Sequence, residues 1–165
     1  MQHLQAHWRV DYVKIPREDR RSPFASLLAE KDKREALLLY SDRHTFIAMN
    51  RYPYNPGHLL VLPRREVGNL WDLTDKERWN LWESIFLGEE MLRQALQPQG
   101  FNVGFNLGMA SGAGIPSHLH CHVVPRWEGD TNFMPVIGSV KVVSQSLEAL
   151  YDQLLPFFQG VDPRP

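Results

Sequence analysis

The sequence contains a single cysteine, Cys121, among its 165 residues. One cysteine excludes an internal disulfide and fits a reducing compartment, so we expect a cytoplasmic protein. Long apolar runs are also missing, because a dense stretch such as Leu59–Leu62 is far shorter than the ~20 residues of a membrane-spanning helix. Residues 1–5 lack the charged-then-apolar pattern of a signal peptide. We therefore expect no membrane partner.

The sequence also has little net charge. Its 18 basic and 19 acidic side chains leave a formal charge of −1. Binding of duplex DNA or RNA requires a broad basic surface, so we expect no nucleic-acid partner. A compact anionic ligand stays compatible with this composition, since it needs only local hydrogen-bond donors.

Internal repeats and low-complexity tracts are absent, while hydrophobic residues make up 43% of the chain and charged residues 22%. This composition is typical of a globular domain. We expect one domain over residues 1–165, with a core at about 36–127, an N-terminal arm at 1–35 and a C-terminal extension at 128–165. The expected anchors of the arm are Trp8, Tyr12 and Phe24.

The apolar patterning predicts an α+β fold. Thr74 and Glu77 have the spacing of a capping box, and the helix that they start should end near Gly100. A second amphipathic helix is expected from Leu147 to Phe158. Short strands are expected at residues 36–40, 45–49, 58–63, 101–107 and 117–125.

Three of the seven histidines alternate with apolar residues, at His118, His120 and His122. In an extended strand the side-chain period of two places all three rings on one face. A neutral imidazole near pH 7 is a competent nucleophile, and the middle ring can be held from both sides. His120 is therefore predicted to attack phosphorus, while its neighbours donate protons or hydrogen bonds to the phosphate oxygens.

Two other interpretations of the histidine row stay open. The rings could be ordinary solvent-facing or hydrogen-bonded residues, or they could bind zinc, since histidine is the commonest metal ligand. Zinc binding is disfavoured because the Cα atoms of His118 and His122 would lie about 13 Å apart in a strand. Two adjacent histidines with a distant ligand could still hold an ion.

A glycine-rich loop, residues 108–114, directly precedes the histidine row. Glycines allow backbone amides to approach a phosphate closely, although such a loop on its own is more often a plain turn. The loop lacks the Gly-Lys-Ser/Thr ending of a P-loop and does not open a predicted helix as a dinucleotide fingerprint does.

Residues 118–124, HLHCHVV, resemble the alternating signature of the histidine triad superfamily. The upstream segment 50–58, NRYPYNPGH, is similar to the segment that precedes the second strand in this family. The resemblance covers roughly residues 36–127. It implies a HIT-like fold with a five-stranded, mostly antiparallel sheet, one long helix and a C-terminal helix, usually assembled as a homodimer or a higher oligomer.

The resemblance also implies roles for individual residues. His120 would be the nucleophile that forms a nucleotidyl-histidine, with His122 at the phosphate or leaving group and His118 fixing the ring of His120. His58 would support the row from the neighbouring strand. The positions that match the family's substrate contacts are Asn50 for the ribose hydroxyls and Asn106 for the phosphates.

Residues 125–133, PRWEGDTNF, resemble the bacterial branch that contains diadenosine tetraphosphate phosphorylases and related hydrolases. Trp8, Arg9 and Tyr12 partly match the N-terminal signature of that branch. Trp127 would stack on a base or pack in an interface, and the resemblance does not decide between them.

Two departures from the family pattern matter. Many relatives carry a Cys-x-x-Cys zinc pair where this sequence has Ser22–Ala25, so a structural zinc is not expected. Relatives often place a serine or threonine at the position of Gly114 or Ile115 to contact phosphate. Here only the backbone amides of Ala113, Gly114 and Ile115 are left to do so.

The sequence thus predicts an enzyme that attacks the α-phosphate of a dinucleoside polyphosphate, such as diadenosine tetraphosphate, as a hydrolase or a phosphorylase. No built-in metal or cofactor is expected, although magnesium could accompany the substrate. Two alternatives stay open: a nucleoside phosphoramidate hydrolase and a non-catalytic nucleotide-binding protein.

Overall fold

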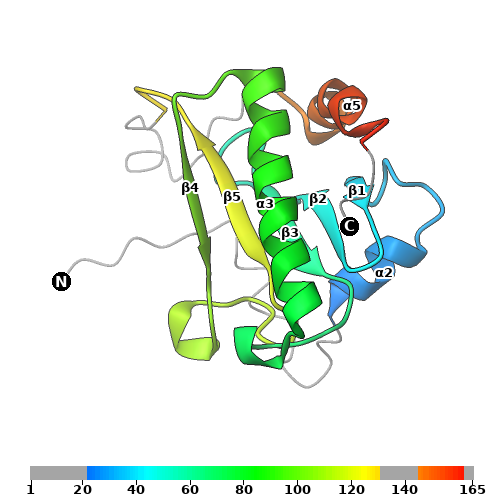
Figure 1. The fold of residues 1–165 in the computed structure, drawn as a ribbon. Helices are drawn as coiled ribbons and strands as arrows, with labels where there is room; N and C mark the ends of the chain where they lie inside the picture. The colour runs from blue at the N-terminus through cyan, green and yellow to red at the C-terminus, as the bar shows by residue number, and fades with distance from the viewer. Residues whose placement is uncertain (1–21, 131–144, 162–165) are drawn as a thin grey trace.

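A computed structural model describes residues 22–130 and 145–161 of the chain, in which five antiparallel strands form one sheet (Figure 1). The strands lie side by side in the order β1-β2-β3-β5-β4, and every neighbouring pair is antiparallel. Their bounds are Leu38–Ser41 for β1, Thr45–Met49 for β2, Leu59–Pro63 for β3, Gly100–Phe105 for β4 and Cys121–Arg126 for β5. The predicted α+β class and five-stranded sheet are confirmed.

Helices cover both faces of this sheet (Figure 1). The long helix α3, Asp75–Leu96, packs on one face with the C-terminal helix α5, Leu147–Phe158, beside it. The short helix α2, Pro23–Ala29, covers the opposite face and buries Phe24 there. Two single turns of 3-10 helix complete the described elements: η3 at Leu70–Asp72 and η4 at Met109–Ser111.

Both long helices start where the sequence predicts. Thr74 caps α3, accepting from the amide of Glu77 while the Glu77 carboxylate accepts from the amide of Thr74, as in a capping box. The C-cap of α3 is Gln97, in the left-handed conformation at φ 49°. The predicted end near Gly100 is therefore slightly late, because the chain turns at Gln97 and then enters β4 at Gly100 itself.

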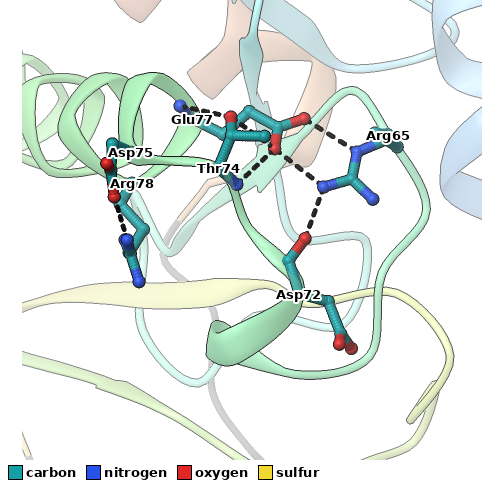
Figure 2. Close-up of polar contacts among 6 residues, drawn as sticks. All are labelled: Arg65, Asp72, Thr74, Asp75, Glu77 and Arg78. Carbon is teal, nitrogen blue, oxygen red and sulfur yellow. Dashed lines mark hydrogen bonds and ion pairs between the residues drawn. The ribbon is translucent and has the colours of Figure 1, made fainter.

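The Glu77 carboxylate also ties the start of α3 to the end of β3. Figure 2 shows Arg65 reaching Glu77 through two hydrogen bonds, of 2.9 and 2.8 Å, and donating to the carbonyl of Asp72. On the exposed side of the same turn Arg78 pairs with Asp75. The hydrogen bonds from Arg65 are the main cause that lowers the pKa of Glu77 to about 2, and those from Thr74 add to it.

Acidification is expected to destabilise the protein through Glu77. Because the pKa of Glu77 is depressed on folding, its contribution is complete above the unfolded value near 4.5 and disappears as the pH falls toward 2. We expect the free energy of unfolding to fall by about 2 kcal/mol. This is less than the full pKa shift implies, because Arg65 is half exposed. Urea unfolding at several pH values would measure it. Glu77→Gln should be less stable at pH 7 and should flatten this part of the pH dependence; an unchanged slope would contradict this origin.

The bounds of β1, β3 and β4 differ modestly from their predictions. β1 starts at Leu38 rather than at Ala36, since Leu37 adopts a positive φ of 55° that interrupts extended backbone. β4 ends at Phe105 rather than at residue 107. The strand expected at 58–63 starts at Leu59, and the one at 45–49 is found as predicted. The proposed anchors Trp8 and Tyr12 lie outside the described residues.

Candidate active site

The three histidines of the row project from the sheet on the side of α2. Phe24 of α2 contacts both His118 and His120, with ring centroids 5.6 and 5.2 Å apart. The intervening Leu119 and Cys121 are buried in the core cluster under α3. The predicted alternation of histidines and apolar residues between the two faces is therefore confirmed.

The prediction of one continuous strand over residues 117–125 is wrong. β5 starts only at Cys121, so His122 lies in the strand while His118 and His120 precede it. The reason lies in β3, which pairs with β5 only from Leu59 to Val61. Farther along, the Pro63 carbonyl accepts a hydrogen bond from the His118 ring instead of from a backbone amide.

His118 is held on both of its ring nitrogens. Its Nε2 lies 2.8 Å from the carbonyl oxygen of Pro63, which can only accept, so Nε2 carries the proton. Nδ1 of the neutral ring then accepts from the hydroxyl of Ser22 at 2.8 Å. The residue is 1% exposed, and burial lowers the pKa of the ring. His118 is thus a fixed, neutral element of the site.

His120 is oriented by the backbone of His118. Its Nδ1 donates to the carbonyl oxygen of His118 at 2.7 Å, so Nε2 of the neutral ring carries a lone pair. Burial lowers the pKa of His120 as well, which keeps the ring unprotonated at pH 7. An imidazole with a fixed orientation and a lone pair on Nε2 has the form that a nucleophile requires.

His122 has the complementary tautomer. The backbone amide of Tyr54 donates to Nδ1 of His58 at 3.0 Å, so the neutral His58 ring carries its proton on Nε2. This Nε2 donates to Nδ1 of His122 at 2.9 Å, which places the proton of a neutral His122 ring on Nε2. The ring centroids of His120 and His122 are 5.1 Å apart. The lone pair on Nε2 of His120 and the N–H on Nε2 of His122 are therefore carried by neighbouring rings.

A pocket of about 320 Å³ opens beside these two rings. This volume is within the range of small-molecule sites. Its walls are mostly apolar and come from α2, from the sheet and from the loop before β3. The lining residues include Phe24, Leu27, Leu37, Ala48, Leu60, Ile115, His120 and His122. We refer to it as the first pocket.

The structure brings several of the predicted substrate contacts together at this pocket. Asn50, Asn106, Gly114 and Ile115 all line it. The Asn50 side-chain oxygen accepts from the amide of Tyr52 at 2.9 Å, which fixes its orientation. Two other candidates are not brought there, because neither Ala113 nor the partly buried Trp127 lines the first pocket.

His58, predicted to support the row, contacts it directly through its hydrogen bond to His122. Sequence reasoning missed Tyr54, whose ring lies over His58 and His122 at centroid distances of 4.7 and 5.8 Å. It also missed the role of Ser22, which was noted only because it stands where many relatives carry a zinc-binding cysteine. No periodic signal marks either residue, although Tyr54 lies within the loop motif that precedes His58.

Cys121 is fully buried, and burial raises the pKa of its thiol to about 12, so it is not a nucleophile at neutral pH. Within residues 22–130 and 145–161, no group of three or more histidine, cysteine, aspartate or glutamate side chains is arranged to hold a metal ion. In the same ranges, no helix has both the length and the apolar character to cross a bilayer.

Comparison with known proteins identifies the same family as the row of histidines. The family model of the HIT domain matches residues 31–129. An AP-4-A phosphorylase of Mycobacterium tuberculosis is 39% identical over 155 residues, which cover 89% of this chain and 79% of the relative. The bis(5'-nucleosyl)-tetraphosphatase [asymmetrical] of Schizosaccharomyces pombe is 31% identical over 93 residues, 56% of this chain and 50% of the relative.

A solved structure supports the fold. The hypothetical histidine triad nucleotide-binding protein ST2152 from Sulfolobus tokodaii aligns with a TM-score of 0.65, at 23% identity. The alignment covers 82% of this chain and 91% of that protein.

Proposed function

The chain belongs to the histidine triad family, and we propose that it is an enzyme that cleaves dinucleoside polyphosphates, such as diadenosine tetraphosphate, at the α-phosphate. The observation that carries this proposal is the pair of tautomers at the first pocket, with a lone pair on His120 Nε2 beside an N–H on His122 Nε2. The names of the two curated relatives support the substrate class.

In the proposed mechanism one nucleoside lies in the first pocket with its α-phosphate against His120. Nε2 of His120 forms a bond to phosphorus while the bond from phosphorus to the bridging oxygen breaks. The Nε2–H of His122 donates to this oxygen as negative charge develops on it. The imidazolium formed at His120 keeps its Nδ1–H on the carbonyl of His118.

In the second step an oxygen nucleophile displaces the His120 ring from the phosphorus. Water or inorganic phosphate attacks the phosphorus while the bond to Nε2 breaks, which restores the neutral ring, and an attacking water releases its proton to the solvent. The amides of Gly114 and Ile115 are the proposed donors to the phosphate oxygens, since both residues line the pocket and neither side chain offers a hydroxyl. Asn50 is the proposed contact of the ribose hydroxyls, and Asn106 that of the phosphates.

The product mixture tests this proposal. Purified protein would be incubated with diadenosine tetraphosphate, with and without inorganic phosphate, and the nucleotides separated. ATP with AMP identifies a hydrolase, and ATP with ADP that depends on added phosphate identifies a phosphorylase. No cleavage, together with turnover of adenosine 5′-phosphoramidate, would make the protein a phosphoramidate hydrolase. No reaction with either substrate would leave only nucleotide binding.

We further propose a homodimer that joins two sheets at β4. This strand lies at the edge of the sheet, and α3 carries an exposed aromatic stripe that consists of Trp79, Trp82 and Phe86. Arg93 of α3 lies over the Phe101 ring of β4 at 5.0 Å, so the C-terminal part of the helix contacts this strand. A second copy of this chain would bury the stripe and pair the strand edge.

Val103→Asp is expected to dissociate this dimer. Val103 is 43% exposed in the middle of β4, and a carboxylate there would be buried without a partner in the assembly. Light scattering after gel filtration should show a dimer for the wild type and a monomer for the variant. Ser41→Asp, which adds the same charge on β1 at the opposite edge of the sheet, should stay dimeric. A monomeric wild type would refute the proposed assembly.

Magnesium is proposed to accompany the polyphosphate substrate rather than to bind the protein alone. Excess EDTA should then slow cleavage, while calorimetric titration of the nucleotide-free protein with magnesium should give no heat of binding. A cytoplasmic location is proposed from the single cysteine, which suits a reducing compartment, and cell fractionation would test it.

A further inference from the structure

A second pocket, of about 460 Å³, lies on the same face of the sheet over β4 and β5. Three residues, Tyr54, Asn106 and His122, line both this pocket and the first one. The two pockets therefore meet at the ring that we propose as donor to the bridging oxygen. None of the predicted roles uses the rest of the second pocket.

The nucleophile lies on one side of this junction only. His120 lines the first pocket and not the second, whereas His122 lines both. In phosphoryl transfer the attacking atom and the leaving oxygen lie roughly in line across the phosphorus. A leaving group displaced by His120 would thus depart past His122, toward the second pocket.

The absence of a side chain at Gly104 keeps this passage open. Gly104 pairs with His122 across β4 and β5, so a side chain at that position would project on the same face as the imidazole. A Cβ placed there would meet no atom within 4 Å. Open space thus lies directly beside His122, where the bridging oxygen and the next phosphate would be.

The floor of the second pocket offers hydrogen-bond donors but little net charge. Arg126 forms a bidentate ion pair with Asp130, at 2.6 and 2.8 Å, which neutralises the charge of the guanidinium locally. It also donates to the side-chain oxygen of Asn102 at 2.6 Å, which turns the amide NH2 of Asn102 away from the guanidinium. Recognition there would rest on the side-chain amides of Asn102 and Asn106, which both line the pocket, rather than on a basic surface.

We propose that the second pocket binds the leaving nucleoside polyphosphate, which is ATP when the substrate is diadenosine tetraphosphate. This inference rests on the proposed function and extends it from the attacked half of the substrate to the departing half. The first pocket holds the nucleoside whose α-phosphate bonds to His120. The second holds the released phosphates through Asn102 and Asn106, next to the Arg126–Asp130 pair.

Asn102→Asp tests this assignment with a change of charge and almost none of shape. The aspartate keeps an oxygen for the hydrogen bond from Arg126, so the fold and the pair with Asp130 are retained. Its negative charge repels a departing polyphosphate but has little to act on when the leaving group is ammonia. We would measure kcat/KM for diadenosine tetraphosphate and for adenosine 5′-phosphoramidate and compare their ratio between the variant and the wild type.

The ratio is expected to fall by about tenfold or more in Asn102→Asp, and the loss should shrink in high salt. Gln99→Glu is the matched control: it adds the same charge three residues away, keeps an oxygen for the amide of Glu128 and lines neither pocket. The control ratio should stay within about twofold of the wild type.

The outcomes separate the two proposals. Turnover of both substrates by the wild type, with an unchanged ratio in Asn102→Asp or an equal fall in Gln99→Glu, would overturn the second pocket as the site of the leaving nucleotide while leaving the nucleophile in place. A wild type that cleaves only the phosphoramidate would instead overturn the proposed cleavage of dinucleoside polyphosphates, and the assignment of the pocket with it, while leaving the nucleophile in place. Failure of the wild type on both substrates would overturn the proposed function itself, and the assignment of the pocket with it.

Discussion

Replacement of His120 by alanine is expected to lower the turnover of diadenosine tetraphosphate by about 10³-fold or more. The ring supplies the atom that bonds to phosphorus, and in the adjacent rings neither the carbons of Phe24 nor Nε2 of His122 offers a second lone pair to replace it. Initial rates of product release, with enzyme in excess to detect residual activity, would measure the loss.

The folded state and the binding of nucleotide should persist in His120→Ala, because the walls of the first pocket stay in place. Calorimetric titration with a nonhydrolysable nucleotide would show this. His44→Ala, which removes a partly exposed histidine outside the row, serves as the control and should keep full activity. Undiminished turnover in His120→Ala would remove His120 from the mechanism.

Replacement of His118 by alanine is expected to reduce stability more than catalysis. The buried ring joins the Ser22 hydroxyl to the Pro63 carbonyl, and its loss leaves both groups buried beside a cavity. We expect a loss of about 3 kcal/mol in the free energy of unfolding, from unsatisfied hydrogen bonds and lost packing together. For a chain of this size the thermal midpoint should fall by about 6–12 °C.

The kinetic effect of His118→Ala should be smaller than that of His120→Ala, since the carbonyl that orients His120 belongs to the backbone of residue 118 and is kept. Ser22→Ala gives a graded comparison, because it removes one of the two bonds to the ring and the N-cap of α2, at a cost of about 1 kcal/mol. A midpoint unchanged by His118→Ala would show that the ring does not support this part of the fold.

The sequence correctly predicted that the three histidines lie on one face of the extended backbone and the apolar residues between them on the other. Alternation of His118, His120 and His122 with apolar residues requires extended backbone, whether or not the strand is hydrogen-bonded. The start of the strand could not be predicted in the same way. It depends on β3, where the Pro63 carbonyl is taken by the His118 ring, and that contact joins residues 55 positions apart.

The capping box at Thr74 was predictable because its two partners are three residues apart. Contacts between residues far apart in the sequence could not be predicted in this way. The bond from Ser22 to His118 links positions 96 residues apart, and the junction of the two pockets at Tyr54, Asn106 and His122 needs three separate segments. Local pattern thus predicts the elements and the family motif, while the shape of the site depends on tertiary packing.

The proposed tautomers and the proposed nucleophile converge on one species, a nucleotide bonded through phosphorus to Nε2 of His120. Rapid mixing with diadenosine tetraphosphate, quenching in base and mass analysis of the peptides would detect it directly. We expect one adenylyl group on the peptide that contains His120, lost on incubation with water or phosphate and absent in His120→Ala. Turnover in which the adenylyl group is found on another residue, or on none at any mixing time, would contradict covalent catalysis by His120.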